Sequence, residues 1–123
     1  MSYTVLVLDD DLHVRESMAI ALEDEGLTVY QAESSEVAFR MLDTVQIDLV
    51  IVDLRLPGMD GVEFISKAVK LWSDLKFIIY TGSPEYDISP EIASEARVSK
   101  IIFLKPLMDC KTIFAEIYKM LGQ

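Results

Sequence analysis

Short apolar runs alternate along the chain with longer stretches in which apolar residues recur at helical spacing. The short runs predict five strands, at residues 3–8, 27–32, 48–52, 76–80 and 101–104. The stretches that follow them predict five helices: 12–25, one capped by Ser34 or Ser35, 62–72, 90–96, and one capped by Asp109. Regular alternation of strands and helices implies a parallel sheet covered on both faces, which is a doubly wound α/β fold.

Two segments make this pattern specific. The run DLVIV at 48–52 is apolar throughout its interior, as expected of a central parallel strand buried on both faces. In the first predicted helix the residues expected to face inward are Leu12, Val14, Met18, Ala21 and Leu22, and Gly26 ends the helix.

Reactive side chains follow four of the five predicted strands. They are Asp9, Asp10 and Asp11 after the first, Asp53 after the third, Thr81 at the end of the fourth and Lys105 after the fifth. Taken singly, each has an ordinary role: Asp11 is expected to cap the first helix, and a lone lysine is usually solvated. Because doubly wound folds bind ligands beyond the carboxyl ends of their strands, their joint presence predicts one site at that edge.

The chemistry of such a site follows from its charges. Grouped carboxylates repel one another, and a hard divalent cation relieves that repulsion; few oxygen ligands in a site that also takes phosphate favour Mg²⁺. Asp53 is the candidate nucleophile toward phosphorus, with Asp10 as a metal ligand. Lys105 and Thr81 would supply an ammonium and a hydroxyl to the negative charge of the transferring group.

Composition narrows the setting. The chain has 123 residues, the usual size of one domain, and a formal net charge of −10, which argues against direct binding to nucleic acid or to an anionic membrane. Cys110 is the only cysteine, so neither an internal disulfide nor a thiolate cluster can form, in keeping with the cytoplasm. The one histidine, His13, excludes a multi-histidine metal site and is expected to be exposed in the first turn of its helix.

Four motifs in this order and spacing closely resemble the response-regulator receiver domain (CheY-like) of two-component phosphorelay systems. They are VLVLDDD at 5–11, DLVIVDLRLPGMDG at 48–61, IIYTG at 78–82 and FLKP at 103–106. The resemblance covers essentially the whole chain and implies a flavodoxin-like sheet of order 2-1-3-4-5. It also implies a single receiver domain over residues 1–123, with no output domain in this chain.

By the same resemblance, Asp53 accepts a phosphoryl group from a histidine kinase or phosphotransfer protein, and the change switches a downstream output domain or protein. Mg²⁺ would be held by Asp9, Asp10, Asp53 and the backbone carbonyl of Arg55, while Thr81 and Lys105 bind phosphoryl oxygens. The Lys105–Pro106 peptide bond is typically cis. The resemblance also implies a homodimer.

The resemblance is incomplete near the fifth strand. Ile102 stands where the family usually has an inward-turning Tyr or Phe, and Val98-Ser99 replace a usual Gly-Ala pair. Phosphoryl acceptance does not depend on these positions, but the usual output switch does.

Three functions therefore remain in competition. A phospho-accepting signalling domain fits all the motifs. The second function is that of an enzyme. A Mg²⁺-dependent phosphohydrolase would carry a second aspartate two positions after the nucleophile, where this chain has Arg55. A nucleotide-binding enzyme would need glycines in the first strand-to-helix turn, which this chain lacks. Ile102 suggests the third, an interaction module that works without phosphorylation. We expect a non-enzymatic domain whose only chemistry is its own phosphorylation and dephosphorylation.

Overall fold

The computed structural model describes residues 3–83, 88–106 and 109–122, and within them strands and helices alternate as predicted. The strands are β1 (Thr4–Leu8), β2 (Thr28–Ala32), β3 (Leu49–Val52), β4 (Lys76–Thr81) and β5 (Val98–Leu104). The helices are α1 (Leu12–Asp24), α2 (Ser35–Thr44), α3 (Gly61–Leu71), α4 (Pro90–Ala93) and α5 (Lys111–Met120).

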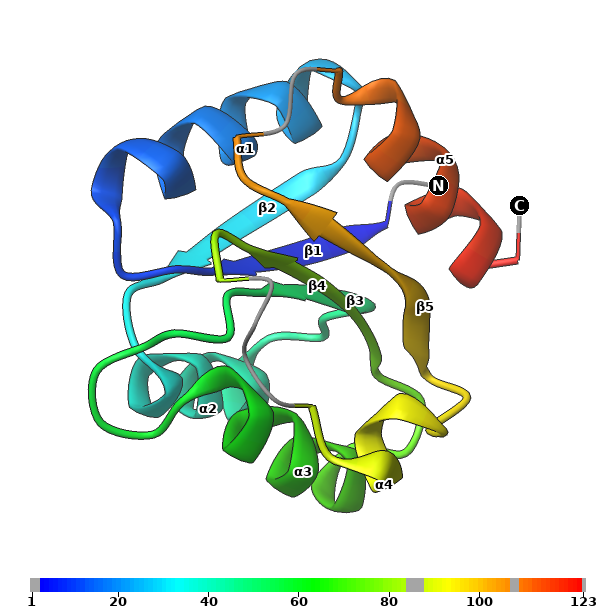
Figure 1. The fold of residues 1–123 in the computed structure, drawn as a ribbon. Helices are drawn as coiled ribbons and strands as arrows, with labels where there is room; N and C mark the ends of the chain where they lie inside the picture. The colour runs from blue at the N-terminus through cyan, green and yellow to red at the C-terminus, as the bar shows by residue number, and fades with distance from the viewer. Residues whose placement is uncertain (1–2, 84–87, 107–108, 123) are drawn as a thin grey trace.

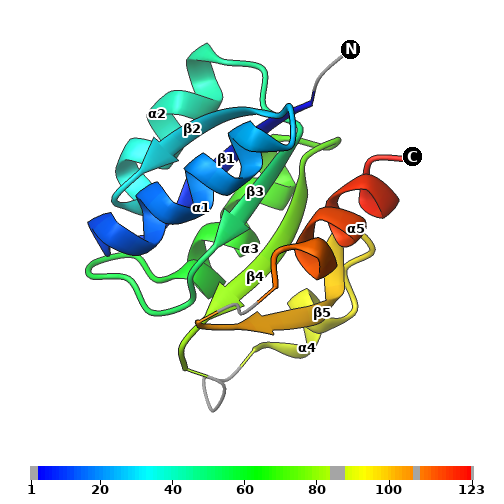
Figure 2. The same cartoon turned by 90° about the horizontal axis from the view of Figure 1, so that it is seen from above.

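All strand pairs are parallel, and the sheet order is β2-β1-β3-β4-β5, as the resemblance implied. Helices α1 and α5 cover one face of the sheet, and α2, α3 and α4 cover the other (Figures 1 and 2). The winding reverses between β1 and β3, because β1 connects to β2 on one side while β3 leads to β4 and β5 on the other. The predicted switch point therefore lies between the ends of β1 and β3.

The sheet divides the apolar core into two clusters. Leu6, Leu8 and Phe64 belong to the cluster beneath α2 and α3, and Val5, Val7 and Ile113 belong to the one beneath α1 and α5. All four residues of β3 are buried, which confirms its central place. A strand buried on both faces holds the residue that follows it, Asp53, in a rigid setting.

The structure corrects five predicted details. In α1, Ala19 rather than Ala21 is among the fully buried residues, and Leu12, at the first position of the helix, is 51% exposed. Cys110 rather than Asp109 occupies the N-cap position of α5, although the Asp109 carboxylate still accepts from the Lys111 N–H at 2.9 Å.

The other two corrections concern the segment between β4 and β5. Helix α4 begins at Pro90 after the predicted Ser89 cap but ends at Ala93, not at 96. Strand β5 begins three residues earlier than predicted, because Val98 pairs with Phe77 of β4 and so draws the chain into the sheet. Residues 94–97 connect the shorter helix to the longer strand. Across the described ranges, we find no helix that is both long and apolar enough to span a bilayer.

Candidate functional site

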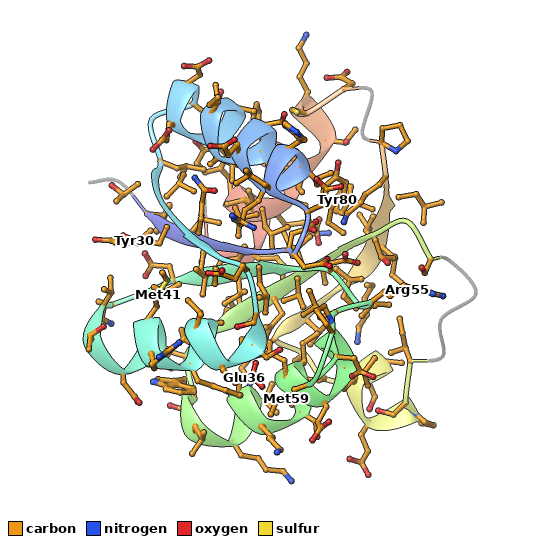
Figure 3. The ribbon with its side chains drawn as sticks, turned by 90° about the vertical axis from the view of Figure 1, so that its left-hand side faces the viewer. Tyr30, Glu36, Met41, Arg55, Met59 and Tyr80 are labelled. Carbon is orange, nitrogen blue, oxygen red and sulfur yellow. The ribbon has the colours of Figure 1, made fainter. Side chains whose placement is uncertain are left out.

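The candidate site is an open cleft of about 490 Å³ at the carboxyl ends of β1, β3, β4 and β5. Its lining includes Asp9, Asp10, Asp53 and Lys105, which come from three well-separated positions in the chain. Figure 3 looks onto this edge of the sheet. The structure therefore brings these four predicted residues together at the switch point.

Asp53 follows β3 directly and is only 7% exposed. Its backbone N–H donates to the Leu8 carbonyl at 3.0 Å, which continues the pairing of β3 with β1 to this residue. Oδ1 of its side chain accepts from the Arg55 N–H at 3.3 Å, and Oδ2 accepts from Lys105 Nζ at 2.9 Å. Each carboxylate oxygen thus has a defined orientation.

Lys105 joins the two sides of the cleft. Its ammonium bonds both Asp53 Oδ2 and Asp9 Oδ2, and its side chain is 15% exposed. Burial lowers the pKa of Lys105, but the hydrogen bonds and charges of Asp9 and Asp53 outweigh burial and raise that pKa above 10.5 overall. The ammonium is therefore charged throughout the neutral range. The Lys105–Pro106 peptide bond is cis, as the resemblance implied.

Asp9 is the most deeply buried acid of the cleft, at 2% exposed. Burial raises the pKa of its carboxyl above 3.8, although the bonds from Lys105 and from the Asp11 N–H act in the opposite direction. The Arg15 guanidinium donates to the Asp9 backbone carbonyl at 2.9 Å and to the Gln31 side chain at 3.2 Å. The end of β1 is therefore tied to both α1 and β2.

The donor set suits a hard cation. One oxygen from each of Asp9, Asp10 and Asp53 lies within 4.8 Å of the others, and Asp10 is exposed at the mouth of the cleft. The charged residues along the described lining are Asp9, Asp10, Asp11 and Asp53, against Arg55 and Lys105. Four carboxylates facing two cationic side chains leave an excess of two negative charges, which a divalent ion would neutralise.

Thr81 and Arg55 differ from the other predicted residues. Thr81 is fully buried, and its hydroxyl accepts from the Ser83 N–H at 3.1 Å, so it lies under the cleft rather than among its lining residues. The Arg55 side chain extends toward the loop after β4, where its Nε donates to Ser83 Oγ at 3.1 Å (Figure 3). The Ser83 hydroxyl and the Arg55 guanidinium thus both border the cleft.

Comparison with known proteins identifies the family of this chain. The model of the response regulator receiver domain family matches residues 5–115. The chain belongs to this family. As a receiver domain of two-component response regulators, it is a member of a signalling family rather than of a classical enzyme family.

The similar proteins differ in how much of their own length this chain covers. The receiver protein CpdR of Brucella abortus is 29% identical over 117 residues, which is 95% of each chain. The regulator KdpE of Escherichia coli is 35% identical over 81 residues, which is 66% of this chain and 36% of KdpE. The chain also spans only 13% of the Brucella abortus sensor kinase CckA.

The response regulator TrrA of Thermotoga maritima, solved in complex with Mg²⁺–BeF, is 25% identical and superimposes with a TM-score of 0.83. The match covers 96% of this receiver domain and 98% of TrrA. The shared fold places the carboxyl edge of the sheet in the same architecture in both proteins.

Sequence reasoning missed several residues that shape this receiver site. Asp60 caps α3 and Gly61 begins it. A Cβ on Gly61 would lie 2.2 Å from the Asp53 carbonyl oxygen, so the glycine allows α3 to start directly behind Asp53. The Arg55–Ser83 bond and the contacts of Arg15 also escaped prediction, because no local pattern indicates pairings between separate loops.

Proposed function

We propose that Asp53 accepts a phosphoryl group from a phosphohistidine donor in a Mg²⁺-dependent reaction, and that this change alters the binding of a partner. The observation that carries the proposal is the Asp53 carboxylate itself, which lies in an acidic cleft with Lys105 Nζ at 2.9 Å from Oδ2. The donor would be a histidine kinase or phosphotransfer protein, and the partner an output domain or protein, or a second copy of the chain.

In this reaction an Asp53 oxygen forms a bond to phosphorus as the P–N bond of the donor breaks, and the released imidazole takes a proton from water. Lys105 would move with the negative charge from the carboxylate to the phosphoryl oxygens. Thr81 would donate its hydroxyl hydrogen to the same group, while its oxygen can still accept from the Ser83 N–H.

Asp9, Asp10, Asp53 and the backbone carbonyl of Arg55 would hold Mg²⁺. Bound there, the ion would neutralise carboxylate and phosphoryl charge and so let two anions approach each other. The excess of acidic over basic side chains in the cleft supports this assignment.

We favour this function over that of a phosphohydrolase because of Arg55. A hydrolase needs an acid and base two residues after the nucleophile, and a guanidinium stays protonated in proteins. Here its Nε also donates to Ser83. The chemistry of the domain is thus limited to its own phosphorylation and dephosphorylation. We place the protein in the cytoplasm, in keeping with its single cysteine, which lies partly buried.

Labelling with acetyl phosphate and Mg²⁺ tests the proposal. We expect one acid- and base-labile phosphoryl group per chain, and none in Asp53→Asn. Asp11→Asn is the matched control, because Asp11 lines the same cleft but serves as the N-cap of α1, a position that Asn also fills. Equal labelling of the native chain and Asp53→Asn would refute the proposal.

A further inference from the structure

Tyr80, the residue before Thr81 in β4, contacts the ammonium of the site. Lys105 Nζ lies 5.5 Å from the centroid of the Tyr80 ring, within the range of a cation–π interaction. Tyr80 is 8% exposed, so this contact forms largely out of water, where the attraction between a cation and a ring face is strongest.

Strand order explains why Lys105 meets this residue. Lys105 follows β5, whereas its partners Asp53 and Asp9 follow β3 and β1, so its side chain has to cross the end of β4. Tyr80 belongs to the cluster beneath α1 and α5 and points to that face of β4 (Figure 3). Its ring therefore lies under the path of the lysine side chain.

The ring itself is held by the core. Tyr80 pairs in register with Phe103 of β5, and both pack in the cluster that contains Met18 of α1 and Ile113 of α5. Because its neighbours come from two helices and an adjacent strand, the ring offers Lys105 a fixed surface rather than a mobile one.

Lys105 has space to leave the site. It lines the acidic cleft and also a second, mainly apolar groove of about 450 Å³ between α1 and the start of α5. His13, Ser17, Tyr80 and Pro106 are among the other residues of that groove. A flexible four-carbon side chain at the junction of two open spaces needs more than one contact to stay in either.

From these contacts we infer that Tyr80 is a positioning residue, which keeps the Lys105 ammonium directed into the cleft before and after phosphoryl transfer. The inference rests on the proposed function. When Asp53 becomes an acyl phosphate, its negative charge moves to the phosphoryl oxygens, and the directional bond from Nζ to Oδ2 is lost. The face of a ring attracts a cation without fixing a bond direction, so Tyr80 can hold the ammonium while it follows the charge.

A series of ring substitutions at position 80 tests this role. Tyr80→Phe keeps the ring, and replacement by di- and trifluorinated phenylalanine keeps its shape while withdrawing the electron density that attracts the cation. The readouts are beryllofluoride affinity in the presence of Mg²⁺ and the rate of labelling by acetyl phosphate, with thermal unfolding as a measure of packing.

We expect Tyr80→Phe to match the native protein within about twofold, and the trifluorinated ring and Tyr80→Leu to weaken beryllofluoride binding by about three- to tenfold. The loss should follow the degree of fluorination at constant unfolding temperature. If Tyr80→Leu does not fold, the fluorinated series decides, because it preserves the packing.

Two negative results have different meanings. If the native protein binds beryllofluoride and fluorination leaves its affinity unchanged, Tyr80 does not position Lys105 and only this inference fails. If the native protein binds no beryllofluoride with Mg²⁺, the proposed function fails, and this inference fails with it.

Discussion

At the scale of single residues, burial is the main influence on the pKa of Asp9. Its pKa is raised above 3.8 mainly by burial, since Lys105 and the Asp11 N–H offset only part of that cost. A carboxyl whose pKa is higher in the folded state binds protons more tightly there than in the unfolded chain. The free energy of unfolding therefore decreases as the pH rises from 3.8 through the raised pKa of Asp9.

This sign leads to a prediction for Asp9→Asn, which carries no titrating group at that position. In the absence of divalent cations, the native protein should lose stability relative to Asp9→Asn as the pH rises from about 4 to 8. Urea unfolding of both proteins at a series of pH values measures the difference. A difference that stays constant, or that changes in favour of the native protein, would contradict the direction of the shift.

Gly61 controls how closely α3 approaches the acceptor loop. A Cβ there would lie 2.2 Å from the Asp53 carbonyl oxygen and 2.8 Å from the Leu54 Cα, and neither backbone atom can yield easily. We expect Gly61→Ala to destabilise the domain by about 1–3 kcal/mol, although alanine is the better helix former. Labelling of Asp53 should also slow, because the backbone that orients its carboxylate shifts.

Gly82→Ala is the control for this effect on stability. Its added Cβ would meet only the Lys105 Cβ, at an ordinary 3.9 Å. Denaturant unfolding should show a much smaller change than for Gly61→Ala. Equal changes in the two variants would mean that the close approach at Asp53 is not what requires glycine.

At the scale of helices and strands, the sequence predicted well what depends on local patterns. The apolar run of β3 and the Ser89-Pro90 start of α4 both lie where expected, because burial and capping act over a few residues. The beginning of β5 was missed because Ser99 and Lys100 interrupt its apolar pattern. Ser99 is nevertheless buried, since its hydroxyl donates to Glu116 of α5, 17 residues away in the chain.

The contacts of the candidate site likewise fall into those that the sequence predicted and those that it did not. Strand ends could be predicted from the sequence, and with them Asp9, Asp53 and Lys105, because parallel strands bring their carboxyl ends to one edge. The approach of Lys105 to the Tyr80 ring could not be predicted, because it depends on the path of a side chain across β4.

The bond between Ser99 and Glu116 fastens α5 to β5. Ser99 Oγ lies 2.5 Å from Glu116 Oε2, and both residues are buried. Ser99→Ala leaves the carboxylate without this donor, and we expect a loss of about 1–3 kcal/mol in urea unfolding. Ser94→Ala is the control, because Ser94 is exposed and its hydroxyl donates to a local carbonyl in α4, so its change should stay within about 0.5 kcal/mol.

The double variant Ser99→Ala/Glu116→Met separates a specific bond from general sensitivity at this position. Replacing both partners by apolar groups removes the unsatisfied carboxylate, so it should recover much of the stability lost in Ser99→Ala. Losses that simply add, within about 0.5 kcal/mol, would show that Ser99 and Glu116 are not coupled.

At the scale of the whole molecule, the acidic cleft lies at one end of β5, a strand that carries exposed apolar residues. Ile102 and Leu104 are 41% and 50% exposed on the edge strand of the sheet. Ile102 is an aliphatic residue where the resemblance led us to expect an aromatic switch. A module that bound its partner through these residues regardless of phosphorylation would have the same conformation of β5 with and without a phosphoryl group on Asp53.

The structure contains a direct path from the site to this strand. The Lys105 N–H donates to the Thr81 carbonyl at 3.0 Å, so the ends of β4 and β5 are joined between the two residues proposed to bind phosphoryl oxygens. If Thr81 turns toward the phosphoryl group and Lys105 moves with the negative charge, the hydrogen bond between the ends of β4 and β5 is strained. Ile79 and Ile102, the next residues in register on that face, then adjust with it.

Hydrogen exchange with Mg²⁺ and beryllofluoride measures this coupling. We expect exchange to change at residues 98–105, and to change much less at β2, which lies at the opposite edge of the sheet. Mg²⁺ alone is the first control, and Asp53→Asn with both reagents is the second. Altered exchange within the cleft but not along β5 would instead favour a module whose partner binding is independent of phosphorylation. In that case the conformational change would extend no further than Lys105.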